Sequence, residues 1–217
     1  MSLIAKLPIA RNSKVGVIGD SITFFGWYYH LIGLSRFATD IGRSPSRGGY
    51  YRTSEPPLDI VWINSGQSGD RISNIEANVA GRITAYQLQA IILAIGVNDL
   101  RFGTSLGTFS TLFNSTVDQA RAAQPGLNIA ATGIFCNGED IPNATESGLL
   151  ALNAIQAATM DRVNGTWTDV HSKVVEWEAE NNPSHLPGGL LTDEGFHPSD
   201  LGKFKFSEWV NPYIQYI

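Results

Sequence analysis

The sequence predicts an α/β fold in which helices cover both faces of a mostly parallel sheet. Short, nearly continuous apolar runs are typical of strands that are buried on both faces. Longer segments with apolar residues at helical spacing alternate with these runs along the chain. An alternation of strands and helices favours a parallel sheet, because each parallel connection has to cross over through a helix.

Four apolar runs predict the strands. They cover residues 15–18, 60–63, 91–95 and 129–134. Each run has the length of a strand and is too short for a typical helix. We expect a sheet of about five strands that contains these four.

Three segments predict helices, because their apolar residues recur every three or four positions. They run over residues 109–120, 149–158 and 206–213. Pro125 and Gly126 supply a stop after the first segment, and Ser199 is available as an N-cap before the third.

Residues 36–57 interrupt this alternation. The segment is rich in Gly, Ser, Pro and Arg and is longer than a simple connection between two elements. We expect a surface loop here, and one that borders a site, since long connections in compact domains are often functional.

Composition limits the function classes. We expect one domain over residues 1–217, which at this length buries about 70% of the unfolded surface. The net charge is -5 and no block of Lys or Arg is present, so nucleic acid is not an expected partner. Cys136 is the single cysteine, which excludes an internal disulfide. The oligomeric state is left open.

The N-terminal residues show no targeting signal. Lys6 and Pro8 interrupt the apolar residues of this segment, and no stretch in the chain approaches the roughly 20 apolar residues of a membrane span. We therefore expect no membrane span, and either a cytoplasmic protein or a secreted one whose leader has been removed.

Polar and glycine-rich segments follow three of the predicted strands. They cover residues 19–23, 64–70 and 96–99. In open parallel sheets ligands bind at the carboxyl ends of the strands, so we expect the three segments to meet at one edge. Ser21 would lie at a sharp turn between strand and helix, where free backbone amides favour negative charge. Asp20, Asp70 and Asp99 are expected to hold these turns through hydrogen bonds to the local backbone.

A serine hydroxyl is a weak nucleophile and needs a base, normally an imidazole. His171 and His185 have no acidic residue in an evident motif, whereas His197 follows Asp193 and Glu194. An acid three or four residues before a histidine can fold back and hold the ring in the correct tautomer. His197 is therefore the candidate base for Ser21.

These segments resemble the sequence blocks of the SGNH hydrolases, also called GDSL esterases and lipases. Residues 19–22 match block I, residues 64–70 match block II with its glycine at Gly69, residues 96–99 match block III, and the segment ending in His197 and Pro198 matches block V. Each block alone is a weak signal. Four blocks in this order span nearly the whole chain and together are a specific signal.

The resemblance implies a flavodoxin-like three-layer α/β/α sandwich that uses no metal ion and no organic cofactor. It implies that Ser21 attacks an ester carbonyl and that His197 takes the proton. The oxyanion would be held by the backbone N–H groups of Ser21 and Gly69 and by the side-chain amide of Asn98. Physical chemistry supports these roles, because an Asn side chain donates where Asp cannot, and glycine allows a close backbone approach.

The acid of the triad departs from the family pattern. The family usually has Asp three residues before the histidine, and this chain has Glu194 there and Asp193 one position earlier. Glutamate can orient a catalytic histidine. We favour Glu194, with Asp193 as the alternative and a Ser–His dyad as a third possibility.

The sequence therefore predicts a serine esterase that acts through an acyl-enzyme on small-molecule or carbohydrate esters. No lid-like amphipathic helix or long apolar insertion is present to hold a fatty chain, which favours small acyl groups such as acetyl. Two alternatives are a lysophospholipase or thioesterase, and a noncatalytic carbohydrate-binding module that keeps the fold.

Overall fold

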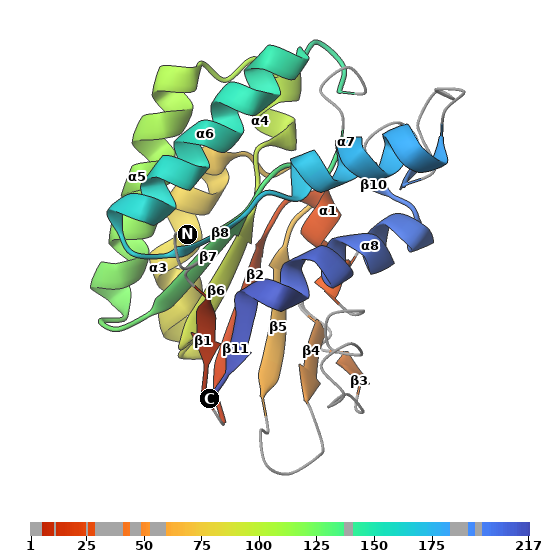
Figure 1. Ribbon diagram of the computed structural model, residues 1–217. Helices are drawn as coiled ribbons and strands as arrows, with labels where there is room; N and C mark the ends of the chain where they lie inside the picture. Colours follow the sequence, from red (N-terminus) through yellow and green to blue (C-terminus); the bar gives the residue numbers. More distant parts are fainter. Residues whose placement is uncertain are drawn as a thin grey trace.

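The computed structural model describes residues 6–10, 12–24, 26–28, 41–43, 49–52, 60–136, 141–182, 191–193 and 197–217. In this part of the chain a central sheet lies between two layers of helices (Figure 1). This arrangement confirms the predicted α/β/α architecture.

The central sheet has the strand order β3–β4–β5–β2–β6–β7–β8. The five strands from β5 to β8 in this order are parallel to one another. Their bounds are Lys14–Gly19 for β2, Val61–Gly66 for β5, Ala90–Ala94 for β6, Asn128–Thr132 for β7 and Thr166–Thr168 for β8. The four predicted runs overlap β2, β5, β6 and β7, and β8 completes the expected five.

Strand β2 is the point at which the chain changes direction across the sheet. Its neighbours are β5 on one side and β6 on the other, so the chain leaves β2 toward one edge and returns past it. Gly19 pairs with Gly66 of β5 and with Ala94 of β6, so the three strands end at one level. Such a switch point leaves a crevice at the strand ends, where ligands bind in open α/β sheets.

The larger helices follow the strands. They are α3 (Ile72–Tyr86), α5 (Leu106–Ala123), α6 (Glu146–Arg162), α7 (Val170–Asn181) and α8 (Asp200–Val210). Helices α3, α5 and α6 gather on one face of the sheet, and α8 lies over the other (Figure 1). The three predicted helical segments are α5, α6 and the region of α8. None of the helices in the described residues is long and apolar enough to cross a membrane.

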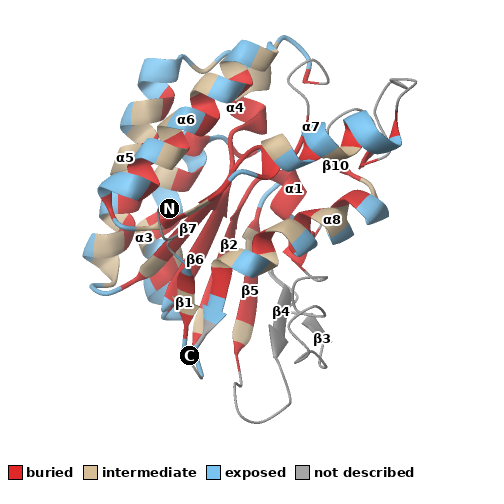
Figure 2. Cartoon of the chain, viewed as in Figure 1, coloured by how far each residue is buried: buried red, intermediate tan, exposed pale blue. Residues whose placement is uncertain are grey.

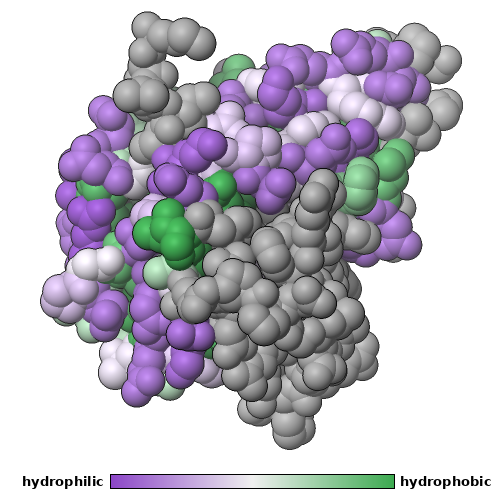
Figure 3. Space-filling model, turned by 60° about the horizontal axis from the view of Figure 1, so that its bottom comes forward, coloured by the Kyte–Doolittle hydropathy of each residue, from purple (hydrophilic) through white to green (hydrophobic). Residues whose placement is uncertain are grey.

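The core lies between these layers. Buried residues fill the strands and the inward faces of the helices, while the exposed residues lie on the outer helix faces (Figure 2). Val15, Val17 and Ile91 have no exposed surface, as expected for strands covered on both faces. Turned so that its bottom comes forward, the molecule presents a described surface that is largely hydrophilic with small apolar areas (Figure 3).

The expectation of a loop over residues 36–57 is wrong for two parts of that segment. Strand β3 (Ile41–Arg43) pairs antiparallel with β4 (Gly49–Arg52), and β4 pairs antiparallel with β5. Both strands are short, and neither forms a continuous apolar run. Short strands at a sheet edge are stabilised by backbone pairing and do not require the apolar pattern of a central strand. The rest of the segment lies outside the described residues.

The two ends of the chain meet in a small separate sheet. Strand β1 (Leu7–Ile9) pairs parallel with β11 (Ile214–Tyr216), with Leu7 opposite Ile214. Leu7 and Ile9 are almost completely buried. This pairing fixes the segment that follows α8 against the N-terminal part of the chain.

Candidate active site

Ser21 is the first residue of the short helix α1 (Ser21–Phe24), which begins directly after β2. Its side chain is buried, with 3% of the residue exposed. The turn requires glycine at position 19, because a Cβ there would lie 2.1 Å from the carbonyl oxygen of Ala94. The strand end, the tight turn and the helix start therefore place Ser21 at the carboxyl end of β2.

His197 lies close to Ser21 although the two residues are 176 positions apart. It opens the two-residue strand β10 (His197–Pro198), and its Nε2 lies 2.9 Å from the Ser21 Oγ. In the tautomer that has its proton on Nδ1, the Ser21 hydroxyl donates to Nε2. A general base requires this contact, since it has to be within hydrogen-bond reach of the proton that it removes.

The segment that carries His197 is fixed from both sides. Ser199 caps α8 by accepting the N–H of Gly202 at 3.0 Å, as predicted, and its own N–H donates to the carbonyl oxygen of Leu191 at 2.9 Å. The N–H of Leu191 donates to the Glu178 carboxylate of α7 at 3.0 Å. Gly202 packs so tightly that a Cβ would lie 1.9 Å from the Leu191 oxygen. These contacts hold the candidate base in place.

The two candidate acids precede His197 by three and four residues in the sequence. Strand β9 (Thr192–Asp193) pairs antiparallel with β10, and the register sets Asp193 opposite His197. Glu194 is in the link between the two strands and lies outside the described residues. The choice between the two acids therefore stays a prediction.

Gly69 and Asn98 follow the strands on either side of β2. Gly69 has φ +84°, a left-handed conformation that favours glycine, and no described atom lies within 4 Å of the place of a Cβ. The requirement for glycine thus comes from the backbone conformation, with open space where a side chain would be. Asn98 is buried near the start of α4 (Val97–Arg101), and its Nδ2 donates to the carbonyl oxygen of Asp70 at 3.0 Å. An amide carries two N–H donors, so this bond orients the side chain and leaves the second N–H for a ligand.

The three buried aspartates join these segments. Asp20 accepts the N–H of Ile22 at 2.9 Å and so holds its own turn, as expected. Asp99 instead accepts the N–H of Ile72, at 2.9 Å, and ties the segment after β6 to the start of α3. Asp70 forms an ion pair with Arg82 at 3.2 Å. The network therefore reaches beyond the local turns that the sequence predicts.

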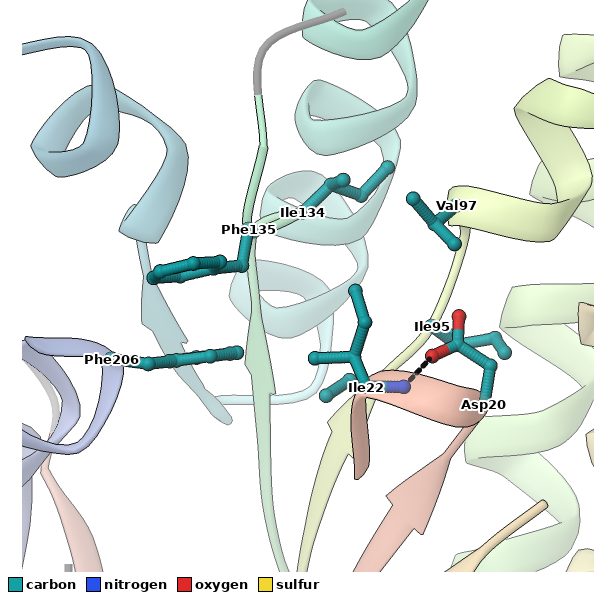
Figure 4. A pocket seen from close by; sticks show the side chains of 9 residues that line it. Asp20, Ile22, Ile95, Val97, Ile134, Phe135 and Phe206 are labelled. Atoms are coloured by element: carbon teal, nitrogen blue, oxygen red, sulfur yellow. Dashed lines mark hydrogen bonds between the residues drawn. The ribbon is translucent and has the colours of Figure 1, made fainter. Parts of the chain in front are cut away.

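A small, mostly apolar pocket lies next to the residues that flank Ser21 (Figure 4). In Figure 4 the rings of Phe135 and Phe206 lie face to face on one side, and the Asp20 carboxyl lies on the other; the ring centroids are 4.9 Å apart. The lining residues are Asp20, Ile22, Ala94, Ile95, Val97, Gly133, Ile134, Phe135 and Phe206.

Burial raises the pKa of Asp20 from its ordinary value of 3.8 to about 7. The hydrogen bond from Ile22 opposes this effect, and the negative charges of Asp99 and Asp70 add to it. Burial likewise raises the pKa of Asp99. A carboxyl next to the candidate nucleophile therefore titrates near neutral pH.

This shift predicts how stability depends on pH. Between pH 3.8 and about 7 the folded chain keeps the Asp20 proton that the unfolded chain has lost, so this group makes the protein less stable as pH rises. Asn keeps an oxygen for the Ile22 N–H and does not ionise. We expect the free energy of unfolding of Asp20→Asn, relative to wild type, to rise by about 3 kcal/mol from pH 5 to pH 8 in urea titrations.

The control for that experiment is Asp118→Asn, which changes an exposed aspartate of a surface ion pair. Its stability relative to wild type should vary little over the same pH range. If Asp20→Asn and wild type show parallel pH profiles, burial does not shift this carboxyl.

His171 has an acidic partner that the sequence does not reveal. It is buried, its Nε2 lies 2.6 Å from the Glu146 Oε1, and its Nδ1 lies 2.8 Å from the carbonyl oxygen of Cys136. The partner is 25 positions away in sequence, so no local motif marks it. Both ring nitrogens of His171 have partners at this second place, so of the two histidines in the described residues only His197 contacts Ser21.

The sequence matches a known protein family. The model of the GDSL-like Lipase/Acylhydrolase family matches residues 17–203. No curated protein sequence matches the chain.

Three solved structures with similar folds illustrate the likeness. A lipase/acylhydrolase from Enterococcus faecalis is 12% identical, with a TM-score of 0.68 over 92% of this chain and 94% of that one. The acetylxylan esterase Axe2 from Geobacillus stearothermophilus is 17% identical, with a TM-score of 0.73 over 95% of this chain and 98% of that one. The acetyl xylan esterase AlAXEase is 16% identical, with a TM-score of 0.69 over 90% and 96%. Together with the family match, which covers most of the sequence, these findings show that the chain belongs to the GDSL-like lipase/acylhydrolase family and is a carboxylic ester hydrolase.

Proposed function

We propose that this chain hydrolyses acetyl and other small acyl esters, with carbohydrate esters as its substrates, by a Ser–His–acid mechanism. The observation that carries the proposal is the 2.9 Å contact between Ser21 Oγ and His197 Nε2. This contact supports the roles of nucleophile and base, and it lies at the switch point of the sheet, where ligands bind in open α/β folds.

The reaction would proceed through an acyl-enzyme. As Ser21 Oγ attacks the ester carbonyl carbon, its proton passes to His197 Nε2 and a tetrahedral oxyanion forms. The intermediate collapses when the C–O bond to the alcohol breaks and His197 returns the proton to the leaving oxygen. Water then attacks the acyl-enzyme with the help of the same imidazole and releases the carboxylic acid and free Ser21.

The oxyanion would be bound by the backbone N–H groups of Ser21 and Gly69 and by the Asn98 side chain. The bond from Asn98 Nδ2 to the Asp70 carbonyl supports this assignment, because it holds the amide without using its second N–H. Donors fixed before the reaction stabilise the developing charge without reorganisation.

Glu194 would orient His197, with Asp193 as the alternative. Among variants of Axe2 described as catalytic mutants, one replaces a histidine and another replaces an aspartate three positions before that histidine. Glu194 has the same spacing to His197. The backbone register, which sets Asp193 opposite His197, supports the alternative.

Two observations support small acyl groups on carbohydrate. The apolar pocket beside the residues that flank Ser21 is small and bounded by the stacked rings of Phe135 and Phe206, so it leaves no room for a long acyl chain. Two of the structural neighbours are acetyl xylan esterases by name.

The experiment is hydrolysis of p-nitrophenyl acetate, butyrate and octanoate, together with acetate release from acetylated xylooligosaccharides. We expect kcat/KM to be highest for acetate and to fall by about tenfold or more to octanoate, since each added methylene that the pocket cannot accommodate is unfavourable. A preference for octanoate would favour the lysophospholipase or thioesterase alternative. An absence of turnover with every ester would contradict the proposal.

A further inference from the structure

We propose that Arg71 and Arg101, gathered around the exposed ring of Phe102, form a cationic subsite for an anionic group on the substrate. This inference rests on the proposed function and extends it by predicting the charge of the preferred ester. The three residues are called the Arg–Phe–Arg cluster below.

The cluster lies next to the proposed oxyanion hole. The backbone N–H of Phe102 donates to the carbonyl oxygen of Asn98 at 3.0 Å, which places Phe102 one helical turn, about 5.4 Å of rise, beyond Asn98. Arg71 follows Asp70, whose carbonyl oxygen accepts the Asn98 side chain. Two chain segments that contribute to the oxyanion hole thus each extend directly into the cluster.

The cluster is an open arrangement of two cations around one ring. The guanidinium carbons of Arg71 and Arg101 lie 5.9 Å and 5.3 Å from the centre of the Phe102 ring. Phe102 is 58% exposed, more than expected for a ring used only in packing. The ring attracts each guanidinium and so limits the conformations that a ligand would have to order.

The positive charge at this place is not neutralised by an ion pair of Arg71. Arg82 pairs with Asp70, the residue before Arg71, and Arg162 pairs with Asp118, whereas Arg71 forms no ion pair with a carboxylate in the part of the chain that the structure describes. The charge of Arg71 acts to lower the pKa of the buried Asp99, but among the described residues no hydrogen bond or ion pair joins the two side chains. The guanidinium donors of Arg71 are therefore available to a ligand.

The cluster brings two positive side chains together in a chain whose net charge is -5. Two like charges around one ring repel each other, and an anion between them removes this repulsion. Guanidinium groups bind carboxylate and phosphate through paired N–H donors. The shared chemistry is therefore an anionic oxygen group on the substrate, near the ester that Ser21 would attack.

The test compares acetyl esters that differ in charge. The substrates are para-acetoxybenzoate, its neutral methyl ester, and para-acetoxyphenyl phosphate, each assayed for kcat/KM. The measured quantity is the kcat/KM of each anionic ester divided by the kcat/KM of the neutral ester. It is determined for wild type and for the double variant Arg71→Gln/Arg101→Gln. This comparison between proteins cancels the intrinsic reactivity of the esters.

We expect the ratio to be about tenfold lower for the double variant than for wild type, because the variant loses exposed charge-assisted hydrogen bonds to the anionic group. The control Arg162→Gln removes one exposed arginine between α5 and α6 and should keep the wild-type ratio. A fall with the carboxylate alone identifies carboxylate esters as the class, and a fall with the phosphate alone identifies phosphate esters. Both support the subsite.

One outcome would contradict the subsite alone, and another would contradict the proposed function as well. If the esters are hydrolysed and the double variant keeps the wild-type ratios, the inference is wrong and the proposed esterase function stands. If wild type hydrolyses none of the esters, the proposed function fails and the inference fails with it.

Discussion

Replacing Ser21 with alanine is expected to lower kcat for p-nitrophenyl acetate by about 10⁴- to 10⁶-fold. Ser21 begins the helix that follows the central strand, and its hydroxyl lies 2.9 Å from His197 Nε2, so alanine removes the oxygen that would form the acyl bond. The substitution leaves the rest of the proposed substrate site unchanged, so KM should change little. Residual activity would come from the oxyanion donors that are left.

The matched control is Ser13→Ala, because Ser13 is also a buried serine and precedes the opposite end of β2. It should keep nearly all activity. Mass spectrometry after rapid quenching should detect an added acetyl group in wild type and none in Ser21→Ala. A variant within tenfold of the wild-type kcat, or one that still acquires the acetyl group, would rule out Ser21 as the nucleophile.

The location of this site could be predicted because it depends on a simple topological rule. The apolar runs identify the central strands, and the carboxyl ends of parallel strands share one edge. The register, in which Gly19 pairs with both Gly66 and Ala94, brings the three predicted segments to one level. The position of Ser21 therefore follows from the sequence pattern without knowledge of any side-chain contact.

Other elements depend on pairing between distant segments, which a local pattern does not record. Strand β8 has only three residues and two of them are Thr, so it forms no apolar run. Strands β1 and β11 are stabilised by each other across nearly the full length of the chain. A parallel pair can form between any two suitable segments, and neither partner alone indicates the other.

Dependence on distant contacts also explains why several features of the site could not be predicted from the sequence. Asp99 reaches back 27 positions to Ile72, and Glu146 is 25 positions from His171. The Arg–Phe–Arg cluster joins residues on either side of α3. Arginines that follow each of two sequence blocks are a signal in principle, but only the fold shows that they share one ring.

The second large effect is expected for the acid that orients His197. With Ser21 bonded to Nε2, the ring has to carry its proton on Nδ1, and the acid stabilises both this tautomer and the imidazolium that forms. We expect Glu194→Gln to lower kcat by about 10³- to 10⁴-fold and Asp193→Asn to stay within about tenfold of wild type. Both substitutions remove one charge and keep side-chain size, so they control for each other.

A third variant separates the orienting role from a general loss of negative charge. Glu194→Asp restores the residue that the family usually has at this spacing, and it should recover much of the activity that Glu194→Gln loses. The measurement is kcat as a function of pH, because loss of the acid also shifts the apparent pKa of the base that the profile reports. The reverse order, with Asp193→Asn the more damaging change, would assign the role to the residue that the backbone register sets opposite His197. Equal and mild effects of both amide variants would mean that the enzyme works as a Ser–His dyad, with the ring oriented by another group.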